Sequence, residues 1–369
     1  MLVLAASVAV ALLGAEVARM QALAVGGLLL PTLWVPAGAL VAALVLTSGR
    51  RAAAAALAGT AALAGLLVWR FDWPVSLAAG IGVIQAAEAC GAAWLTRRFA
   101  GGDFSVHRTR DLGLFIGAVA AASLAGALAV GLWLGVVAPA MPIRDAWMAW
   151  WMSDVTGILL AAPFLIALGS SEKPILSTEL LARTIEIGVL AVMAVVAGYG
   201  VFGGGFPSAI STPAFCLPVF LWASFRFGAG GTSAVLMVVA SIGISYTLQG
   251  RGPFAMPSAT PAAWLMRTQG TSSMAVISFM LLGSMVAERR RALIERAELV
   301  AKLQAALTEL RVLQGMIPIC AWCHKIRDDA GDWHKLEAYV EANSAATFSH
   351  GICPSCTAAH PVPQQLPRT

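Results

Sequence analysis

The sequence predicts an all-α membrane protein of about eight to ten transmembrane helices, followed by a helical coiled-coil linker and a small four-cysteine α+β module of the zinc-binding type. Hydrophobic residues make up 59% of the 369 residues and charged residues only 12%, whereas soluble domains carry about a quarter charged residues. Long apolar stretches recur throughout residues 2–287. Four of the six cysteines form two matched pairs near the C-terminal end.

Ten apolar stretches approach the length of about 20 residues that a helix needs to cross a bilayer. They are residues 2–25, 33–49, 52–69, 75–96, 111–138, 149–168, 184–203, 212–225, 230–248 and 268–287. The weakest are the first stretch, which contains Glu16 and Arg19, and residues 212–225, which Pro213 and Pro218 interrupt. The N-terminus has no basic segment or small-residue cleavage site, so we expect a first span and not a removed signal peptide.

Basic residues in the connecting loops divide into two sets of unequal size. Ten spans place both termini on one side of the membrane, together with the Arg289-Arg-Arg291 run, and the positive-inside rule makes the side with more basic residues cytoplasmic. We therefore expect a multi-pass protein of the bacterial inner membrane with both termini in the cytoplasm. Because loop arginines account for the net charge of +5, no nucleic-acid partner is expected. The set on the C-terminal side is Arg50, Arg51, Arg97, Arg98, Arg108, Arg110, Lys173, Arg183 and Arg226; the other is Arg19, Arg70, Arg144, Arg251 and Arg267.

Residues 288–314 change abruptly to a charged, helix-forming composition that continues the last span. Leucine and valine side chains recur there at alternating spacings of three and four, which is the seam of a two-stranded coiled coil. The pattern predicts a homodimer formed through residues 288–314. The alternative is an amphipathic helix lying on the protein or the membrane surface. The seam residues are Leu293, Val300, Leu303, Leu307 and Leu310.

Cys320 and Cys323 form one pair, and Cys353 and Cys356 form another after 29 intervening residues. Each two-residue turn presents both sulfurs to one point, and four thiolates can close a tetrahedron around Zn²⁺. His350 is the residue that could replace one thiolate. A cytoplasmic location is reducing, which favours metal binding over structural disulfides; a redox-active thiol pair is the alternative. The pairs bracket a module at residues 315–360, and the proline-rich residues 361–369 are expected to be disordered.

Ionisable residues within spans are costly to bury and mark functional sites by default. Glu88 and Gln85 lie in the fourth stretch, and Asp154 lies in the sixth, after Trp150 and Trp151. We expect these five residues to form the part of the membrane region that accepts a stimulus or ligand. The alternative for Asp154 is a packing role in an ion pair with an arginine such as Arg144.

Other polar features of the spans have simpler interpretations. Glu186 is expected at a helix N-terminus, where the helix dipole favours a carboxylate. Cys90 and Cys216 are expected to be small core residues. The glycine-rich residues 203–205 and 228–231 are expected to be loops between spans.

Two parts of the chain resemble known families. Residues 1–287 resemble the first type of MASE domain, a membrane-associated sensor region of bacterial signalling proteins, through Trp34-Val-Pro-Ala-Gly38, Leu221-Trp-Ala-Ser-Phe-Arg-Phe-Gly228 and Gly250-Arg-Gly-Pro-Phe254. Residues 313–356 resemble a cysteine-paired module found at the C-terminal end of many bacterial sensor kinases and regulators. Together these resemblances imply a sensory protein.

No kinase, cyclase or phosphodiesterase domain is recognisable after residue 290, and the string Gly101-Gly-Asp-Phe104 lies in a loop without a catalytic domain around it. We therefore expect a non-enzymatic sensor that relays a periplasmic or intramembrane stimulus through the coiled coil to a cytoplasmic zinc module, which binds a signalling protein. The alternative is a transporter or channel-like protein with a regulatory zinc or redox tail.

Overall fold

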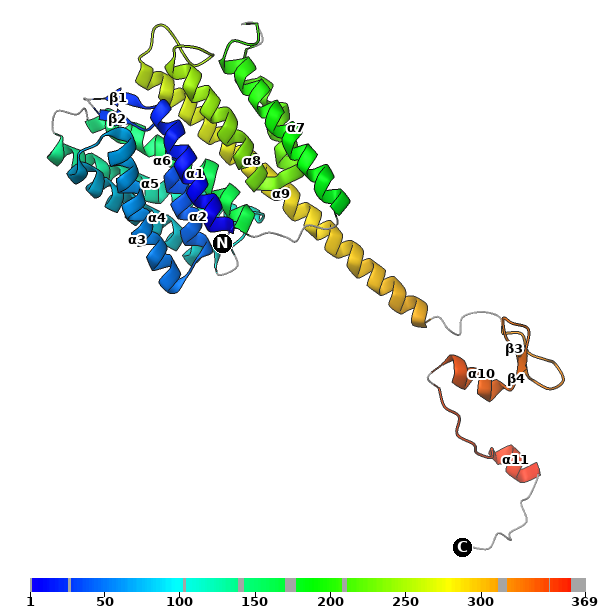
Figure 1. The fold of residues 1–369 in the computed structure, drawn as a ribbon. Helices are drawn as coiled ribbons and strands as arrows, with labels where there is room; N and C mark the ends of the chain where they lie inside the picture. Colours follow the sequence, from blue (N-terminus) through cyan, green and yellow to red (C-terminus); the bar gives the residue numbers. More distant parts are fainter. Residues whose placement is uncertain are drawn as a thin grey trace. The chain divides into compact units, whose positions relative to one another are not determined.

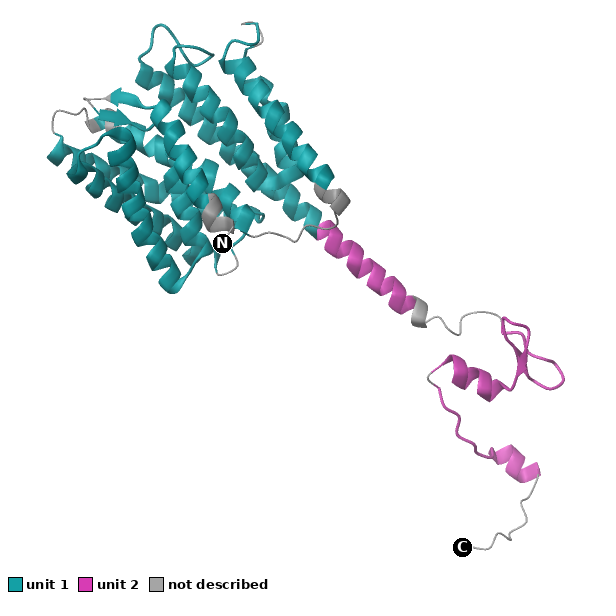
Figure 2. Cartoon of the chain, in the orientation of Figure 1, with its two compact units in different colours: residues 1–291 teal, residues 292–369 magenta. Residues whose placement is uncertain are grey.

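The computed structural model describes residues 2–25, 28–101, 104–138, 143–169, 177–207, 211–310, 317–344 and 346–359. The chain divides into two compact units, residues 1–291 and 292–369 (Figure 2). In chain order the elements are α1 (Leu2–Met20), β1 (Leu23–Val25), β2 (Leu28–Leu30), α2 (Val35–Leu46), α3 (Gly49–Phe71), α4 (Val75–Ala100), α5 (Thr109–Val137), α6 (Ile143–Gly169), α7 (Ser177–Phe202), the 3-10 helix η1 (Pro213–Cys216), α8 (Leu217–Leu248), α9 (Pro261–Leu310), β3 (Ile326–Arg327), β4 (Trp333–His334), α10 (Leu336–Asn343) and α11 (Pro354–Ala359) (Figure 1).

The first unit is a bundle of apolar helices, which confirms the predicted all-α polytopic class. Among the described residues, seven helices, α3 to α9, are long and apolar enough to cross a membrane. The predicted number of eight to ten spans also counted α1, α2 and the first part of α8. Two short antiparallel strands, β1 and β2, join α1 to α2 with Leu23 opposite Leu30.

α2 differs from its prediction as a span because it is a core helix. Its 12 residues extend about 18 Å at 1.5 Å per residue, which is shorter than the hydrocarbon core of about 30 Å. Nine of the 12 residues are buried, and the helix packs against α1, α3, α4 and α6. An apolar helix with helices on all sides contributes hydrophobic contacts in every direction, so hydropathy alone cannot distinguish it from a short span.

α8 reverses its direction at Gly228, whose φ of 64° and ψ of −159° are not helical. The Thr232 hydroxyl lies 3.2 Å from the Ser224 hydroxyl, although residues eight apart in a straight helix are separated by about 12 Å. Phe220 and Leu236 line one small cavity. The stretches 212–225 and 230–248 are therefore two antiparallel legs. The predicted loop at 228–231 is wrong, because the helix resumes at residue 229 and the turn needs only one glycine.

Interhelical contacts identify the two ends of the bundle. At one end, Arg97 donates to the carbonyl oxygens of Leu44 (3.0 Å) and Thr47 (2.6 Å), and Thr109 at the start of α5 contacts Glu288 of α9. We call this the arginine-rich end. At the opposite end, the Gln21 side-chain amide, just after α1, donates to the Ser241 carbonyl oxygen and to the Ser245 hydroxyl of α8.

The two predicted sets of basic residues lie at these two ends, Lys173 being outside the described residues. Because the helices alternate in direction, the N-terminal end of α1 and the Arg289–Arg291 run both lie at the arginine-rich end. The structure thus supports the pairing of the loops, and the helix directions follow from the hydrogen bonds that fix α1, α2, α4, α5 and α9 at those ends.

The second unit begins within α9, which is a single helix of 50 residues. It then contains an antiparallel hairpin of β3 and β4, with Ile326 opposite His334, and two short helices. The sequence around Asp328 and Gly331 predicts a turn, and residues 336–343 predict a short helix; the structure contains both. Ile326 is the one buried apolar side chain among the described residues of this unit. Residues 311–316, including Gly315, and the predicted tail 361–369 lie outside the described residues.

Candidate functional site

A cluster of polar side chains is buried where α2, α4, α5 and α6 meet. The Trp34 indole N–H donates to Gln85 Oε1 (2.9 Å), and Gln85 Nε2 lies 3.5 Å from Asp154 Oδ1. The Ser123 hydroxyl donates to Glu88 Oε1 (2.5 Å). All five side chains are buried, and Glu88, at 5% exposure, is the most accessible. We call these five residues the carboxyl cluster.

Glu88 and Asp154 are the ionisable members of the cluster, and their carboxyl groups are close enough to interact directly. In each carboxyl, one oxygen has no hydrogen-bond donor within the described part of the chain. Neither carboxyl forms an ion pair with a described lysine, arginine or histidine. Two buried carboxylates without a compensating charge are unfavourable in an apolar bundle, so the pair requires a proton or a cation.

Glycines allow the helices of the cluster to approach closely. A Cβ on Gly157 of α6 would lie 2.4 Å from the Trp34 carbonyl oxygen, and a Cβ on Gly126 of α5 would lie 2.3 Å from Glu88 Oε2. The Trp34 backbone N–H also donates to the Ser153 carbonyl oxygen (3.4 Å). The start of α2 is therefore docked on α6, and this contact places the indole N–H against Gln85.

The structure brings several of the predicted site residues close to one another. Gln85, Glu88 and Asp154 lie together, and the Trp150 side chain also interacts with Asp154. Trp150 is buried with its ring 6.1 Å from that of Trp73, whereas Trp151 stacks on Trp147 at 6.1 Å between ring centres. Trp34 and Ser123 were not predicted. Ser123 is a lone hydroxyl in an apolar helix, which is a weak signal in the sequence.

Three alternative interpretations can be compared with the structure. Arg144 precedes Asp154 by ten residues on the same helix, about 15 Å, and the two form no ion pair. Glu186 was expected at a helix N-terminus, but α7 begins at Ser177, and the carboxylate binds Arg226 Nε at 2.7 and 2.9 Å. Cys216 is buried as expected, whereas Cys90 is exposed, because it faces outward from α4.

The carboxyl cluster is linked to α9 through the helices that carry it. On α6, two residues after Asp154, the Thr156 hydroxyl lies 2.7 Å from the Ser273 hydroxyl of α9. On α5, Thr109 donates from its hydroxyl to Glu288 of α9 (2.9 Å). A shift of α5 or α6 caused at the cluster would therefore act directly on α9.

The first cysteine pair lies on a tight turn before β3. The Cys320 N–H donates to the Lys325 carbonyl oxygen (2.8 Å), the His324 N–H donates to the Cys320 carbonyl oxygen (2.9 Å), and His324 has a left-handed φ of 56°. The backbone N–H of Cys323, followed by that of Trp322, lowers the pKa of the Cys320 thiol by hydrogen bonding to the sulfur. This arrangement stabilises a thiolate.

The second pair lies at the start of α11. The Ser355 hydroxyl, 3.4 Å from the Cys353 sulfur, and the backbone N–H of Cys356 lower the pKa of Cys353 to about 7. The structure does not bring the two pairs together: no group of three or more His, Cys, Asp or Glu side chains among the described residues is close enough to hold a metal ion. His350 is exposed, and His334 contacts Asp328 (2.7 Å) instead.

Comparison with known proteins assigns the first unit. The family model MASE1 matches residues 3–290, which span the helical bundle and end near the point where the second unit begins. No curated protein and no solved structure matches the chain. The matched region and the seven apolar helices identify a multi-pass inner-membrane protein. The chain belongs to the MASE1 family of membrane sensory domains.

Proposed function

We propose that the protein is a non-enzymatic sensor in which the carboxyl cluster receives a periplasmic or intramembrane stimulus and α9 carries the response to a cytoplasmic zinc module that binds a signalling partner. The observation that carries this proposal is the contact between α6 and α9. Asp154 in the cluster and Thr156, whose hydroxyl contacts Ser273 of α9, lie within one turn of α6. α9 then continues as one helix to Leu310, so it can transmit rotation or displacement of its membrane part.

The orientation follows from the distribution of basic residues. The larger set of arginines lies at the arginine-rich end, where α9 leaves the bundle, and the positive-inside rule makes that end cytoplasmic. Both termini are then cytoplasmic. A cysteine-accessibility assay with an impermeant thiol reagent on spheroplasts tests this orientation: the C-terminal cysteines should react only after the membrane is broken.

The output helix is proposed to dimerise. Four predicted seam residues of α9 are between 48% and 63% exposed, and no other described part of the chain packs over them. They are Leu293, Val300, Leu303 and Leu307. A parallel coiled coil of two copies would bury these side chains. Leu303→Cys should form intermolecular disulfides well above the level of the unmodified chain, whereas Ala305→Cys, on the opposite face of the helix, should not.

The C-terminal module is proposed to fold around zinc. Its described part buries one apolar side chain, which is far too little to stabilise some forty residues. Each cysteine pair has both sulfurs on one turn and N–H groups directed at a sulfur, which suits a metal ligand. The two pairs lie apart in the described residues. Zinc binding would bring all four thiolates, those of Cys320, Cys323, Cys353 and Cys356, to one ion. Purified full-length protein should then contain about one zinc per chain.

The signalling role is tested by removing the module. Deletion of residues 315–369 should abolish co-purification of a cytoplasmic partner while leaving insertion into the membrane intact. Unchanged co-purification would contradict the proposed output. A transporter is the second candidate, and it is favoured only if proteoliposomes show solute uptake that Asp154→Asn removes.

A further inference from the structure

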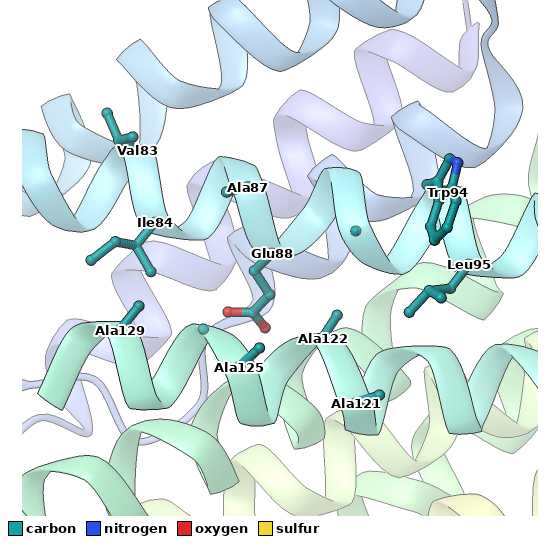
Figure 3. Close-up of a pocket in the computed structure, with 12 residues that line it drawn as sticks. Val83, Ile84, Ala87, Glu88, Trp94, Leu95, Ala121, Ala122, Ala125 and Ala129 are labelled. Atoms are coloured by element: carbon teal, nitrogen blue, oxygen red, sulfur yellow. The ribbon is translucent and has the colours of Figure 1, made fainter. Parts of the chain in front are cut away.

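We infer that the groove between α4 and α5 is a binding site for a lipophilic amine that enters from the bilayer and pairs with Glu88. This inference rests on the proposed function, since it names the class of ligand that the carboxyl cluster would detect. The groove has a volume of about 480 Å³, and Glu88 is its one ionisable lining residue. Figure 3 shows the Glu88 side chain directed from α4 towards α5, where Ala122 and Ala125 lie.

The walls of the groove fit an apolar ligand. Small residues line the α5 side, including Ala121 and Ala125, while Val83 and Trp94 of α4 lie at its two ends. Val83 and Trp94 are each 60% exposed and lie within a membrane-spanning helix, so the groove faces lipid. Residues 83–94 extend about 16 Å along the helix. A ligand dissolved in the bilayer can therefore enter without crossing a layer of polar residues.

The chemistry at the floor of the groove selects a cation. Glu88 accepts a hydrogen bond from Ser123 on one oxygen, and its other oxygen has no N–H or hydroxyl donor within the described chain; the other side chain that interacts with Glu88 is the Asp154 carboxyl. That second oxygen lies against Gly126, which also lines the groove. Asp154 lies behind Glu88 and adds a second carboxyl without a cationic partner in the described residues. An ammonium group would supply both the missing donor and the missing positive charge.

Binding at this point has a direct route to α9. An ammonium group at Glu88 changes the charge that faces Asp154, and Asp154 is bonded through Gln85 to Trp34 of the core helix α2. Asp154 and Thr156 lie on the same turn of α6, and Thr156 contacts α9. The ligand would thus alter the helix that holds α9 without contacting α9 itself.

The test uses the full-length protein in phosphatidylcholine nanodiscs and radiolabelled dodecylamine, with binding to empty nanodiscs subtracted. Wild-type protein should bind dodecylamine saturably, and Glu88→Gln should bind it about 10- to 100-fold more weakly, as expected for the loss of a hydrogen bond to a charged group. Glu186→Gln is the matched control, because that carboxylate already pairs with Arg226 and lies on another helix; its binding should equal that of the wild type.

A second pair of variants tests the groove itself. Ala121→Phe fills the groove without changing a polar group and should remove dodecylamine binding. Leu128→Phe is its control, because Leu128 is 53% exposed on the same helix and is not a lining residue. 1-Dodecanol, which has the same chain without the charge, should compete only weakly.

Several results would overturn the inference. They are binding no greater than that of empty nanodiscs, unchanged binding by Glu88→Gln, and competition by 1-dodecanol equal to that of dodecylamine, which would indicate a protonated carboxyl that needs no cation. If wild type binds no amine and Ala121→Phe converts a dimer to a monomer, the groove is occupied by a second copy. If the protein does not bind dodecylamine but still co-purifies with its partner, this inference alone is overturned. If the protein binds dodecylamine but does not co-purify with a partner, the proposed output is overturned.

Discussion

Replacement of Gly157 by alanine should destabilise the bundle by about 1–3 kcal/mol, the usual cost of adding a methylene to a well-packed core. The added Cβ would lie 2.4 Å from the Trp34 carbonyl oxygen and 2.5 Å from the Trp34 carbonyl carbon. Both atoms belong to the backbone at the start of α2, so no side-chain rotation can relieve the contact. α2 and α6 must instead separate, which also pulls the Trp34 indole away from Gln85.

Gly117→Ala is the matched control for this substitution. Gly117 lies within α5, and a Cβ there would meet nothing within 4 Å. Alanine in place of glycine inside a helix stabilises by roughly 0.5–1 kcal/mol because the unfolded chain loses less conformational entropy. The two variants make the same chemical change, so the difference between them isolates the close contact between α2 and α6.

The assay is thermal unfolding of full-length protein in a mild detergent, followed by tryptophan fluorescence. The apparent midpoint of Gly157→Ala should fall by about 2–4 °C for each kcal/mol lost, while that of Gly117→Ala should stay equal to the wild type or rise slightly. If Gly157→Ala unfolds at the wild-type temperature, or both variants shift equally, α2 does not pack closely on α6 at Gly157.

Three further predictions concern other parts of the chain. Trp34→Phe leaves the buried Gln85 oxygen without its donor and should lower stability by about 1–3 kcal/mol in the same unfolding assay; an unchanged midpoint would contradict the buried hydrogen bond. In the C-terminal unit, the Asp332 backbone N–H and then the His334 ring lower the pKa of the Asp328 carboxyl below its usual 3.8. Its stabilisation of the β3–β4 turn should therefore be complete above pH 3.8 and decline as the pH falls through the lower folded-state pKa, and the amide NMR signal of Asp332 should move with that titration; movement centred above pH 4 would refute it. Chelation of zinc should unfold the C-terminal module and leave the thermal midpoint of the bundle in place, as followed by amide NMR and fluorescence; a module that keeps its fold after chelation would exclude a structural metal.

Much of the architecture could be predicted from the sequence because a bilayer imposes its thickness on every spanning helix. The positions of the long helices, the turn at residues 328–331 and the helix at 336–343 follow from local composition. Glu88, Gln85 and Asp154 could be selected as candidates because burying a polar side chain inside a membrane span costs free energy, so such residues are usually functional. The partition of the arginines also follows from sequence, since it depends only on the alternation of helix direction.

The tertiary structure decided how the helices meet. Lipid-facing and bundle-facing side chains are equally apolar, so hydropathy does not reveal which faces pack together. It could not show that α2 is a buried helix, that Gly228 reverses the chain, or that Glu186 pairs with Arg226 across two helices. For the same reason, the sequence did not show that Trp34 and Ser123 belong to the candidate site. Hydrogen bonds between distant segments depend on the packing of whole helices, whereas the ability to cross the bilayer depends on each segment alone.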